Sequence, residues 1–253
     1  MALGRMDLPA GDLPDFFTFP HFSAVELPVE YWTKTSSGPS NRRALPLDGF
    51  RSVVCGNIMD SALCGVIVRT LSARRREFAE EAGRVLTSLA GKGVSSAVLD
   101  CNLEEILGDP EAEETMREIL LRLAPVLLKH GMTLILPFRV PSRHAPGELG
   151  RFLRRTLLPC VRTRLEVHPF DRETPRPEQA GGALRLELQS ILFVYDADSG
   201  SRIRKSHVRP WLDWTESLGV RVPFLLCPKS QRQRMALPEA SVWDGIAEEF
   251  QNS

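Results

Sequence analysis

Three stretches of the chain share one pattern, in which an amphipathic helix runs into glycine and then directly into a strand. The units are Arg74–Leu89, Gly91 and Gly93 before Ser95–Asp100; Ala112–His130 and Gly131 before Met132–Pro137; and Val208–Leu218 and Gly219 before Val220–Leu226. Glycine adopts the left-handed conformation that ends a helix without a Cβ penalty. Repeated units of this kind predict parallel strands covered by helices, with chemistry at the C-terminal ends of the strands.

The chain is long enough for one α/β barrel or one doubly wound sheet, at 253 residues. No linker divides it, so we expect a single domain over residues 1–253, with residues 1–20 as an irregular lead-in. Seven strands are expected, with Phe16–Phe19 as a candidate eighth. Because little material precedes residue 50, the predicted fold is a parallel (β/α) barrel that is irregular or short of one unit at its N-terminal end.

Charge and cysteine content restrict the partners and the compartment. Lys+Arg and Asp+Glu both number 32, so no global basic field favours nucleic acid or an anionic membrane. No apolar run approaches the roughly 20 residues that span a bilayer. The five cysteines, Cys55, Cys64, Cys101, Cys160 and Cys227, are scattered and odd in number. They are typical of buried thiols, and we therefore expect a cytoplasmic protein that binds neither nucleic acid nor membrane.

The strand predicted at residues 161–168 separates its two faces cleanly. Val161, Thr163, Leu165 and Val167 alternate with Arg162, Arg164, Glu166 and His168. In a parallel barrel the outward side chains pack against helices and must be apolar. The charged set is therefore predicted to point inward, with Glu166 and His168 toward the mouth.

The same alternation assigns faces to three earlier strands. On the first, Glu26 is predicted to face inward between Val25 and Leu27. On the next, Val54 and Ile58 are predicted to face outward and Asn57 inward. On the third, the apolar set Ala97, Leu99 and Cys101 faces outward, which turns Val98, Asp100 and Asn102 inward. The strands that end near Arg139, Asp196 and Lys229 are apolar on both faces, and their parity stays open.

Polar residues thus gather at the C-terminal ends of the predicted strands. The ring consists of Glu26, Asn57, Asp100, Arg139, Glu166, His168, Asp196 and Lys229. One interpretation is that strand ends simply meet water. The other is a ligand site, which we prefer for the ring as a whole because charged groups at a barrel mouth are costly unless paired or bound.

Several segments, in this order and spacing, resemble one family. They are Ala24–Pro28, Arg74–Ala82 before Ala97–Asp100, Leu123–Pro125 with Lys129–Leu136, and Leu165–His168. The chain resembles the xylose isomerase-like TIM barrels, which include sugar and sugar-phosphate isomerases and epimerases. The resemblance covers most of residues 24–230, and it implies a TIM-type barrel, an isomerase or epimerase activity and a role in carbohydrate metabolism.

The resemblance also implies a divalent metal, held by two Glu, one Asp and one His at strand ends. This chain departs from that pattern. Arg139 ends the strand on which the first Glu usually lies, Lys229 follows the final strand in place of the last Glu, and Glu166 and His168 are two residues apart instead of three. We therefore expect no cofactor, and a divalent metal is disfavoured because its oxygen ligands are too few and nearby cations repel it.

Three functions remain open at this stage. In the first, an enzyme removes a proton next to the carbonyl of a sugar, with Glu166 or His168 as the base. Arg139 and Lys229 would then hold an anionic group of the ligand, with Glu26, Asn57, Asp100 and Asp196 as further binding residues. In the second, the barrel has lost catalysis and binds a ligand or partner. A metal-dependent nuclease is the third, disfavoured by a total of five His. The substrate and the oligomeric state are left open.

Overall fold

The structure is a computed structural model that describes residues 24–27, 29, 32, 52–59, 72–171, 174–180, 184–195, 205–220, 222 and 224–228. Several predictions fall outside these residues: the lead-in 1–20 with the candidate strand Phe16–Phe19, and the site residues Asp196 and Lys229. Within the described residues, no helix combines the length and the apolar character that a membrane crossing requires.

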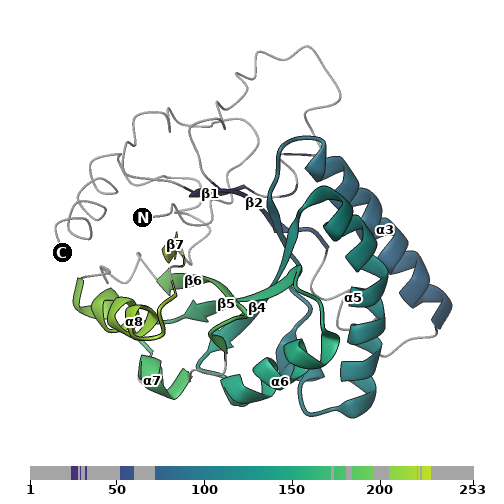
Figure 1. Cartoon of the computed structure of the whole chain (residues 1–253). Coiled ribbons are helices and arrows are strands. Elements are labelled where there is room, and N and C mark those ends of the chain that lie inside the picture. Colours follow the sequence, from purple (N-terminus) through teal and green to yellow (C-terminus); the bar gives the residue numbers. More distant parts are fainter. Residues whose placement is uncertain are drawn as a thin grey trace.

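A curled parallel sheet forms the centre of the molecule (Figure 1). Its strands are β1 (Ala24–Leu27), β2 (Ser52–Asn57), β3 (Ser96–Val98), β4 (Thr133–Val140), β5 (Val161–Val167), β6 (Leu188–Tyr195) and β7 (Phe224–Pro228). Each strand pairs in parallel with the next one in the sequence, from β1 to β7. A doubly wound sheet would reverse its strand order at one point, and the sequential order excludes it.

Helices lie along the outer side of the curled sheet (Figure 1). The described helices are α3 (Ser72–Ala90), α4 (Leu103–Ile106), α5 (Pro110–His130), α6 (Pro146–Thr156), α7 (Pro177–Ala180) and α8 (Lys205–Ser217). Strands that alternate with covering helices, in sequential order, form the (β/α) barrel that the sequence predicts. The described part contains seven strands, one fewer than the eight of a regular TIM barrel.

Two apolar clusters reveal the two sides of the sheet. The larger cluster lies between sheet and helices, and its strand residues include Cys55, Ala97, Leu134, Leu136, Phe138, Val161, Leu165, Val167, Ile191 and Phe193, with Leu99 directly after β3. The smaller one consists of Val54, Val98 and Ile135, and belongs to the inner side. The predicted faces of β3 and β5 are confirmed, and the open parity of β4 is settled, because Ile135 lies inside while Leu134 and Leu136 lie outside.

The predicted faces of β2 are partly wrong. Val54 was expected to face the helices, yet it joins Val98 and Ile135 inside, while Cys55 packs on the helix side. The register with β3 shifts between Cys55 and Asn57. Such an irregularity resets the alternation, and it explains why Ile58, on the same predicted face as Val54, does reach the outer core.

Two of the described helices are single turns. Helix α7 spans Pro177–Ala180, before β6 begins at Leu188. The short helix α4, directly after β3, was not expected. It begins after Asn102, which adopts the left-handed conformation with φ 51°, a conformation that asparagine tolerates better than most residues.

Local sequence explains where the best-defined helices begin and end. The side chain of Asp109 accepts hydrogen bonds from the backbone N–H groups of Glu111 and Ala112 at 3.0 and 3.2 Å and so caps α5. Gly131, with φ 62°, ends the same helix as the sequence predicts. Helix α6 ends differently, at Leu157, which has φ 53° and a surface exposure of 85%.

Replacing Leu157 with glycine should stabilise the protein. The left-handed conformation strains a leucine but not a glycine, and the exposed side chain loses no core contact. Allowing for the greater freedom of glycine in the unfolded chain, we expect a gain of about 0.5–1 kcal/mol in the free energy of unfolding. Urea unfolding followed by circular dichroism measures it. The matched control is Gly131→Ala, which should destabilise, and a loss of stability in Leu157→Gly would contradict the assignment.

Candidate functional site

Six of the eight predicted site residues lie in the described part, at the C-terminal ends of five neighbouring strands. They are Glu26 in β1, Asn57 in β2, Asp100 after β3, Arg139 in β4, Glu166 in β5 and His168 after β5. Because the strands are parallel, their C-terminal ends meet at one edge of the sheet. The side chains are not equally accessible: Glu26 is buried, Asn57, Asp100, Glu166 and His168 are partly exposed, and Arg139 is exposed.

Asn57, Asp100 and Arg139 form one polar cluster across β2, β3 and β4. The side-chain oxygen Oδ1 of Asn57 accepts a hydrogen bond of 2.9 Å from the backbone N–H of Asp100. The carboxylate of Asp100 in turn lies 3.6 Å from Nη2 of Arg139, whose side chain is 57% exposed. This distance is long for a charged pair. The guanidinium of Arg139 is therefore only loosely held and open to solvent.

A second cluster lies deeper and is built around Arg164, which the sequence places on the inner face but outside the predicted site. Arg164 Nη1 donates to Glu26 Oε2 at 2.6 Å, and its Nη2 donates to Glu166 Oε1 at 2.7 Å. The side chains of Arg164 and Glu26 are each 1% exposed, and that of Glu166 is 12% exposed. Two predicted site residues are thus joined by a buried guanidinium.

The sheet register brings the two clusters side by side. Arg139 on β4 is the direct partner of Glu166 on β5. His168 is the first residue after β5, and its backbone N–H donates to the carbonyl of Val140 at 3.2 Å. The carbonyl of His168 accepts from the backbone N–H of Asp171 at 3.0 Å and from the hydroxyl of Thr174. The predicted catalytic residues therefore lie where β5 turns into the loop that follows it.

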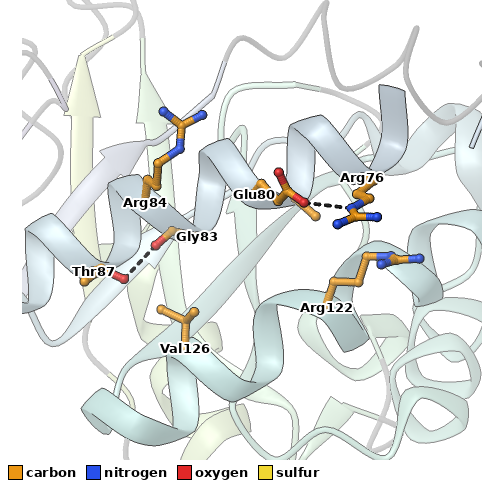
Figure 2. Close-up of a pocket in the computed structure, with 8 residues that line it drawn as sticks. Arg76, Glu80, Gly83, Arg84, Thr87, Arg122 and Val126 are labelled. Carbon is orange, nitrogen blue, oxygen red and sulfur yellow. Dashed lines mark hydrogen bonds and ion pairs between the residues drawn. The ribbon is translucent and has the colours of Figure 1, made fainter. Parts of the chain in front are cut away.

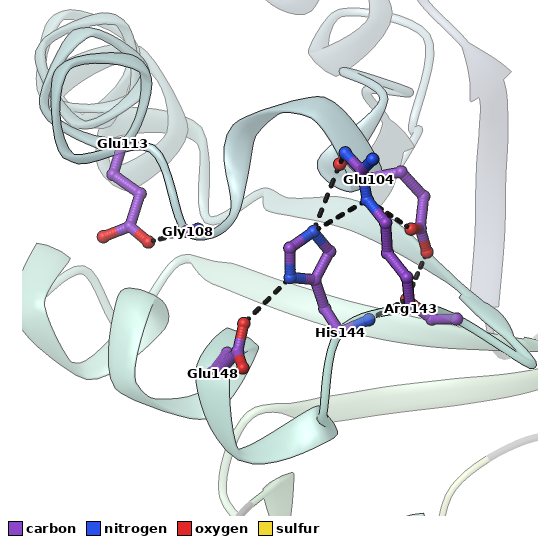
Figure 3. Close-up of polar contacts among 7 residues, drawn as sticks. Glu104, Gly108, Glu113, Arg143, His144 and Glu148 are labelled. Atoms are coloured by element: carbon purple, nitrogen blue, oxygen red, sulfur yellow. Dashed lines mark hydrogen bonds and ion pairs between the residues drawn. The ribbon is translucent and has the colours of Figure 1, made fainter.

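The loops that follow β3 and β4 carry a further polar cluster that was not predicted from the sequence (Figure 3). Arg143 and Ser142, from the loop after β4, both bind Glu104 of α4. Arg143 Nε lies 3.4 Å from a carboxylate oxygen of Glu104 and its Nη2 donates to the Glu104 carbonyl, while the Ser142 hydroxyl donates to the carboxylate. These contacts fasten two loops at the same edge of the sheet as the predicted site.

His144 extends this cluster to helix α6 (Figure 3). Its Nδ1 lies 2.9 Å from Glu148 Oε2, and its Nε2 lies 3.2 Å from the Glu104 carbonyl oxygen. The His144 side chain is only 15% exposed. Because its contacts join the loop after β4 to α4 and α6, we interpret the cluster as a support for the mouth. The polar run Pro141–Glu148, directly after a predicted strand, is the signal that could have indicated it.

A hollow of about 700 Å³ lies elsewhere, between α3 and α5 on the outer side of the barrel. Figure 2 shows its lining, with Val126 of α5 near Gly83 of α3, and Arg122 beside the pair of Arg76 and Glu80. Arg76 Nε donates to Glu80 Oε1 at 2.8 Å in this exposed pair. Since this hollow faces away from the strand ends, it contributes no residue to the candidate site.

Solved structures share this architecture along almost the whole chain. A 3-keto-D-glucoside 4-epimerase from E. coli matches 100% of this chain and 98% of its own, with a TM-score of 0.62 and 11% identity. A D-psicose 3-epimerase from Clostridium cellulolyticum, solved with D-tagatose, matches 95% and 92%, with a TM-score of 0.62 and 12% identity. A xylose isomerase domain protein from Planctomyces limnophilus matches 91% and 89%, with a TM-score of 0.53 and 11% identity.

The chain has the fold of the xylose isomerase-like barrels. This confirms the fold that the sequence resemblance implies. No protein-family model and no curated protein matches the chain. At such low identity the structural likeness establishes the fold alone.

The donor set of this barrel does not fit a divalent metal in the described residues. Among them, no group of three or more His, Cys, Asp or Glu side chains lies close enough to hold one. Arg139 stands at the end of β4, and Arg164 lies between the carboxylates of Glu26 and Glu166. Guanidinium groups in these places repel a dication and already neutralise the oxygen donors. The metal-free site itself stays a prediction.

The geometry predicts very different stability costs for the two site arginines. Arg139→Ala should lower the free energy of unfolding by less than about 1 kcal/mol, because it removes a long and exposed pair. Arg164→Met should cost about 3–5 kcal/mol, because it leaves two carboxylates without their buried partner. Denaturant unfolding of both variants measures the difference. Equal costs would mean that Arg139 is as structural as Arg164.

Proposed function

We propose that this chain binds a small anionic sugar-like molecule at the C-terminal ends of its strands. We further propose that it isomerises or epimerises that molecule without a divalent metal. The observation that carries the proposal is the exposed guanidinium of Arg139, which is only loosely held by Asp100 at 3.6 Å. Arg139 is also the register partner of Glu166 on the neighbouring strand. The fold supports it, because the barrels with this architecture include sugar epimerases, one of them solved with D-tagatose.

The proposed reaction begins with removal of the proton on the carbon next to the carbonyl. The electron pair of that C–H bond forms a new C=C bond, the π pair of the carbonyl moves onto its oxygen to give an enolate, and the proton passes to Glu166 or His168. Return of a proton to the opposite face gives the epimer, and return to the neighbouring carbon, with a shift of the hydroxyl proton, gives the isomer. Arg139 would stabilise the enolate oxygen or hold a carboxylate or phosphate of the ligand.

Arg164 gives Glu166 a defined position for this role. Its Nη2 holds Oε1 of Glu166 at 2.7 Å, and the Glu166 side chain stays 12% exposed toward the mouth. A catalytic base must lie within hydrogen-bond reach of the proton that it takes, so a fixed carboxylate is an advantage. Asn57 and Asp100, fixed by their own hydrogen bond, would bind ligand hydroxyl groups.

One specific observation favours the alternative of a barrel that binds a ligand without turning it over. The carboxylate of Glu166 already forms an ion pair with a buried guanidinium, and Arg139 lies on the next strand. A carboxylate that is already paired with a guanidinium is less available to accept a proton. In this alternative the same residues bind the same class of ligand, and only turnover is missing.

The compartment and the partners complete the proposal. We propose a cytoplasmic protein of carbohydrate metabolism that binds neither nucleic acid nor membrane, in keeping with equal numbers of 32 basic and 32 acidic residues. The thiols of Cys55, Cys101 and Cys160 are buried and form no disulfide in the described part. Burial raises the pKa of the Cys160 thiol, which keeps this group in its unreactive, protonated form.

Hydrogen exchange in heavy water separates catalysis from binding. The protein is incubated in D₂O with D-tagatose, D-allulose, sugar phosphates and sugar acids, and deuterium next to the carbonyl is followed by NMR. We expect exchange with at least one of them, reduced by about 100-fold or more in Glu166→Gln or His168→Asn if that residue is the base. Exposed Glu178→Gln is the matched control. Exchange with none of the sugars, although one of them stabilises the protein, would favour the binding barrel.

Arg139 is predicted to bind the anionic group of the ligand. Because charge-assisted hydrogen bonds contribute roughly 1.5–3 kcal/mol each, Arg139→Ala should weaken binding of that ligand by more than about tenfold. Thermal melts with the same sugar phosphates and sugar acids measure this as a lost rise in melting temperature. Arg154→Ala, an exposed arginine on α6, is the control. An unchanged affinity in Arg139→Ala would remove Arg139 from the site.

A further inference from the structure

We propose that Arg164 is the resident cation of this barrel. In this role its guanidinium occupies the position between Glu26 and Glu166 that a soluble cation would otherwise have to fill. The inference rests on the proposed function in one respect, because it names what organises the same site. Beyond that function, the positive charge that a dissociable ion would supply comes here from the side chain of Arg164.

The contacts of Arg164 are those of a bound cation. It is among the largest fully buried side chains in the described part of the chain, at 1% exposure. Its two terminal nitrogens reach two different carboxylates, at 2.6 Å to Glu26 and 2.7 Å to Glu166. Distances this short are typical of strong charge-assisted hydrogen bonds. The guanidinium therefore bridges the carboxylates instead of serving one of them.

The bridge crosses the inside of the barrel. Strands β1 and β5 are separated by β2, β3 and β4 in the sheet order, so they are not neighbours in the sheet. Glu26 and Arg164 lie 138 residues apart in the sequence. They meet only because the sheet curls, and the pair is therefore part of the barrel interior. Any ion that replaced the guanidinium would lie in this same enclosed space.

The charges explain why some cation is required there. The side chain of Glu26 is 1% exposed and that of Glu166 is 12% exposed, and both reach the same guanidinium. Two carboxylates held so near one another and away from water are strongly unfavourable unless they are protonated or neutralised. Arginine stays protonated at any working pH and cannot dissociate from the chain. It therefore supplies the neutralising charge permanently, whatever the concentration of metal in solution.

This role predicts more than a loss of stability on mutation. An ordinary buried ion pair only destabilises when one partner is removed. A resident cation leaves behind a vacant space between two carboxylates that another cation can enter. The deciding experiment is therefore chemical rescue, in which Arg164→Ala is offered Mn²⁺ or guanidinium ion at millimolar concentration.

Thermal melting and electron paramagnetic resonance provide the two measurements. In the wild type we expect no Mn²⁺ uptake and no change in melting temperature. In Arg164→Ala we expect one Mn²⁺ per chain and a rise of about 3–6 °C in melting temperature at 1 mM Mn²⁺, for a Kd of roughly 100 µM. Guanidinium ion at low millimolar concentration should also raise it. Glu26→Gln in the Arg164→Ala background should weaken Mn²⁺ binding by at least about tenfold, because it removes one of two carboxylate ligands.

Arg162→Ala is the matched control, because Arg162 lies on the same face of β5 and donates to the Leu186 carbonyl instead of a carboxylate. It should take up no Mn²⁺. If Arg164→Ala does not fold, two other variants decide. Arg164→Lys should fold and exclude Mn²⁺, and the double variant Glu26→Gln, Arg164→Met should be more stable than Arg164→Met alone.

The proposal is overturned if Arg164→Ala folds and responds to neither cation. It is equally overturned if the wild type itself binds Mn²⁺ stoichiometrically, or if Glu26→Gln brings no gain to Arg164→Met. None of these measurements involves a sugar or its turnover. A wild type that neither binds nor exchanges any sugar would refute the proposed function and leave the cation result unaffected, so the two can fail separately.

Discussion

A guanidinium buried between two carboxylates fixes the inside of this barrel, and the arrangement of its C-terminal face depends on that interaction. Arg164 joins β5 to β1 through Glu26 and holds Glu166 at the end of its own strand. Because β4 pairs with β5 in register, Arg139 comes to lie next to Glu166. The exposed pair of Arg139 and Asp100 then continues the network to β3. A buried set of ion pairs around Arg164 and an exposed pair of Arg139 and Asp100 therefore lie side by side at the C-terminal face.

The sequence predicts the fold and one strand especially well. Strict alternation in β5 leaves a single assignment of its faces, since burying four charged residues against helices would be far too costly. The structure confirms the prediction that Arg164 and Glu166 face inward, because Arg164 contacts both Glu26 of β1 and Glu166. The glycines at the ends of α5 and α8 have φ 62° and 67°, as the pattern of helix, glycine and strand requires. Both features depend on residues that are close together in the sequence, so one sequence is enough to predict them.

Features that depend on distant parts of the chain could not be predicted. The shift in register at Cys55 and Asn57 arises between two strands, and it turns Val54 inward against the expectation from alternation alone. The pairing of Glu26 with Arg164 requires the curl of the sheet, which no local pattern specifies. The loop cluster of Glu104, Arg143 and His144 joins two loops that are separated by helix α5.

The sequential order of the strands has a consequence for folding. Each strand pairs with the one before it, so most contacts can form between consecutive βα units at modest loop-closure entropy. The contact of Glu26 with Arg164 is different, because its residues are separated by 138 positions. It can form only after the intervening strands have assembled and curved. We therefore expect it to form late in folding, because an incompletely curved sheet cannot bring Glu26 to Arg164.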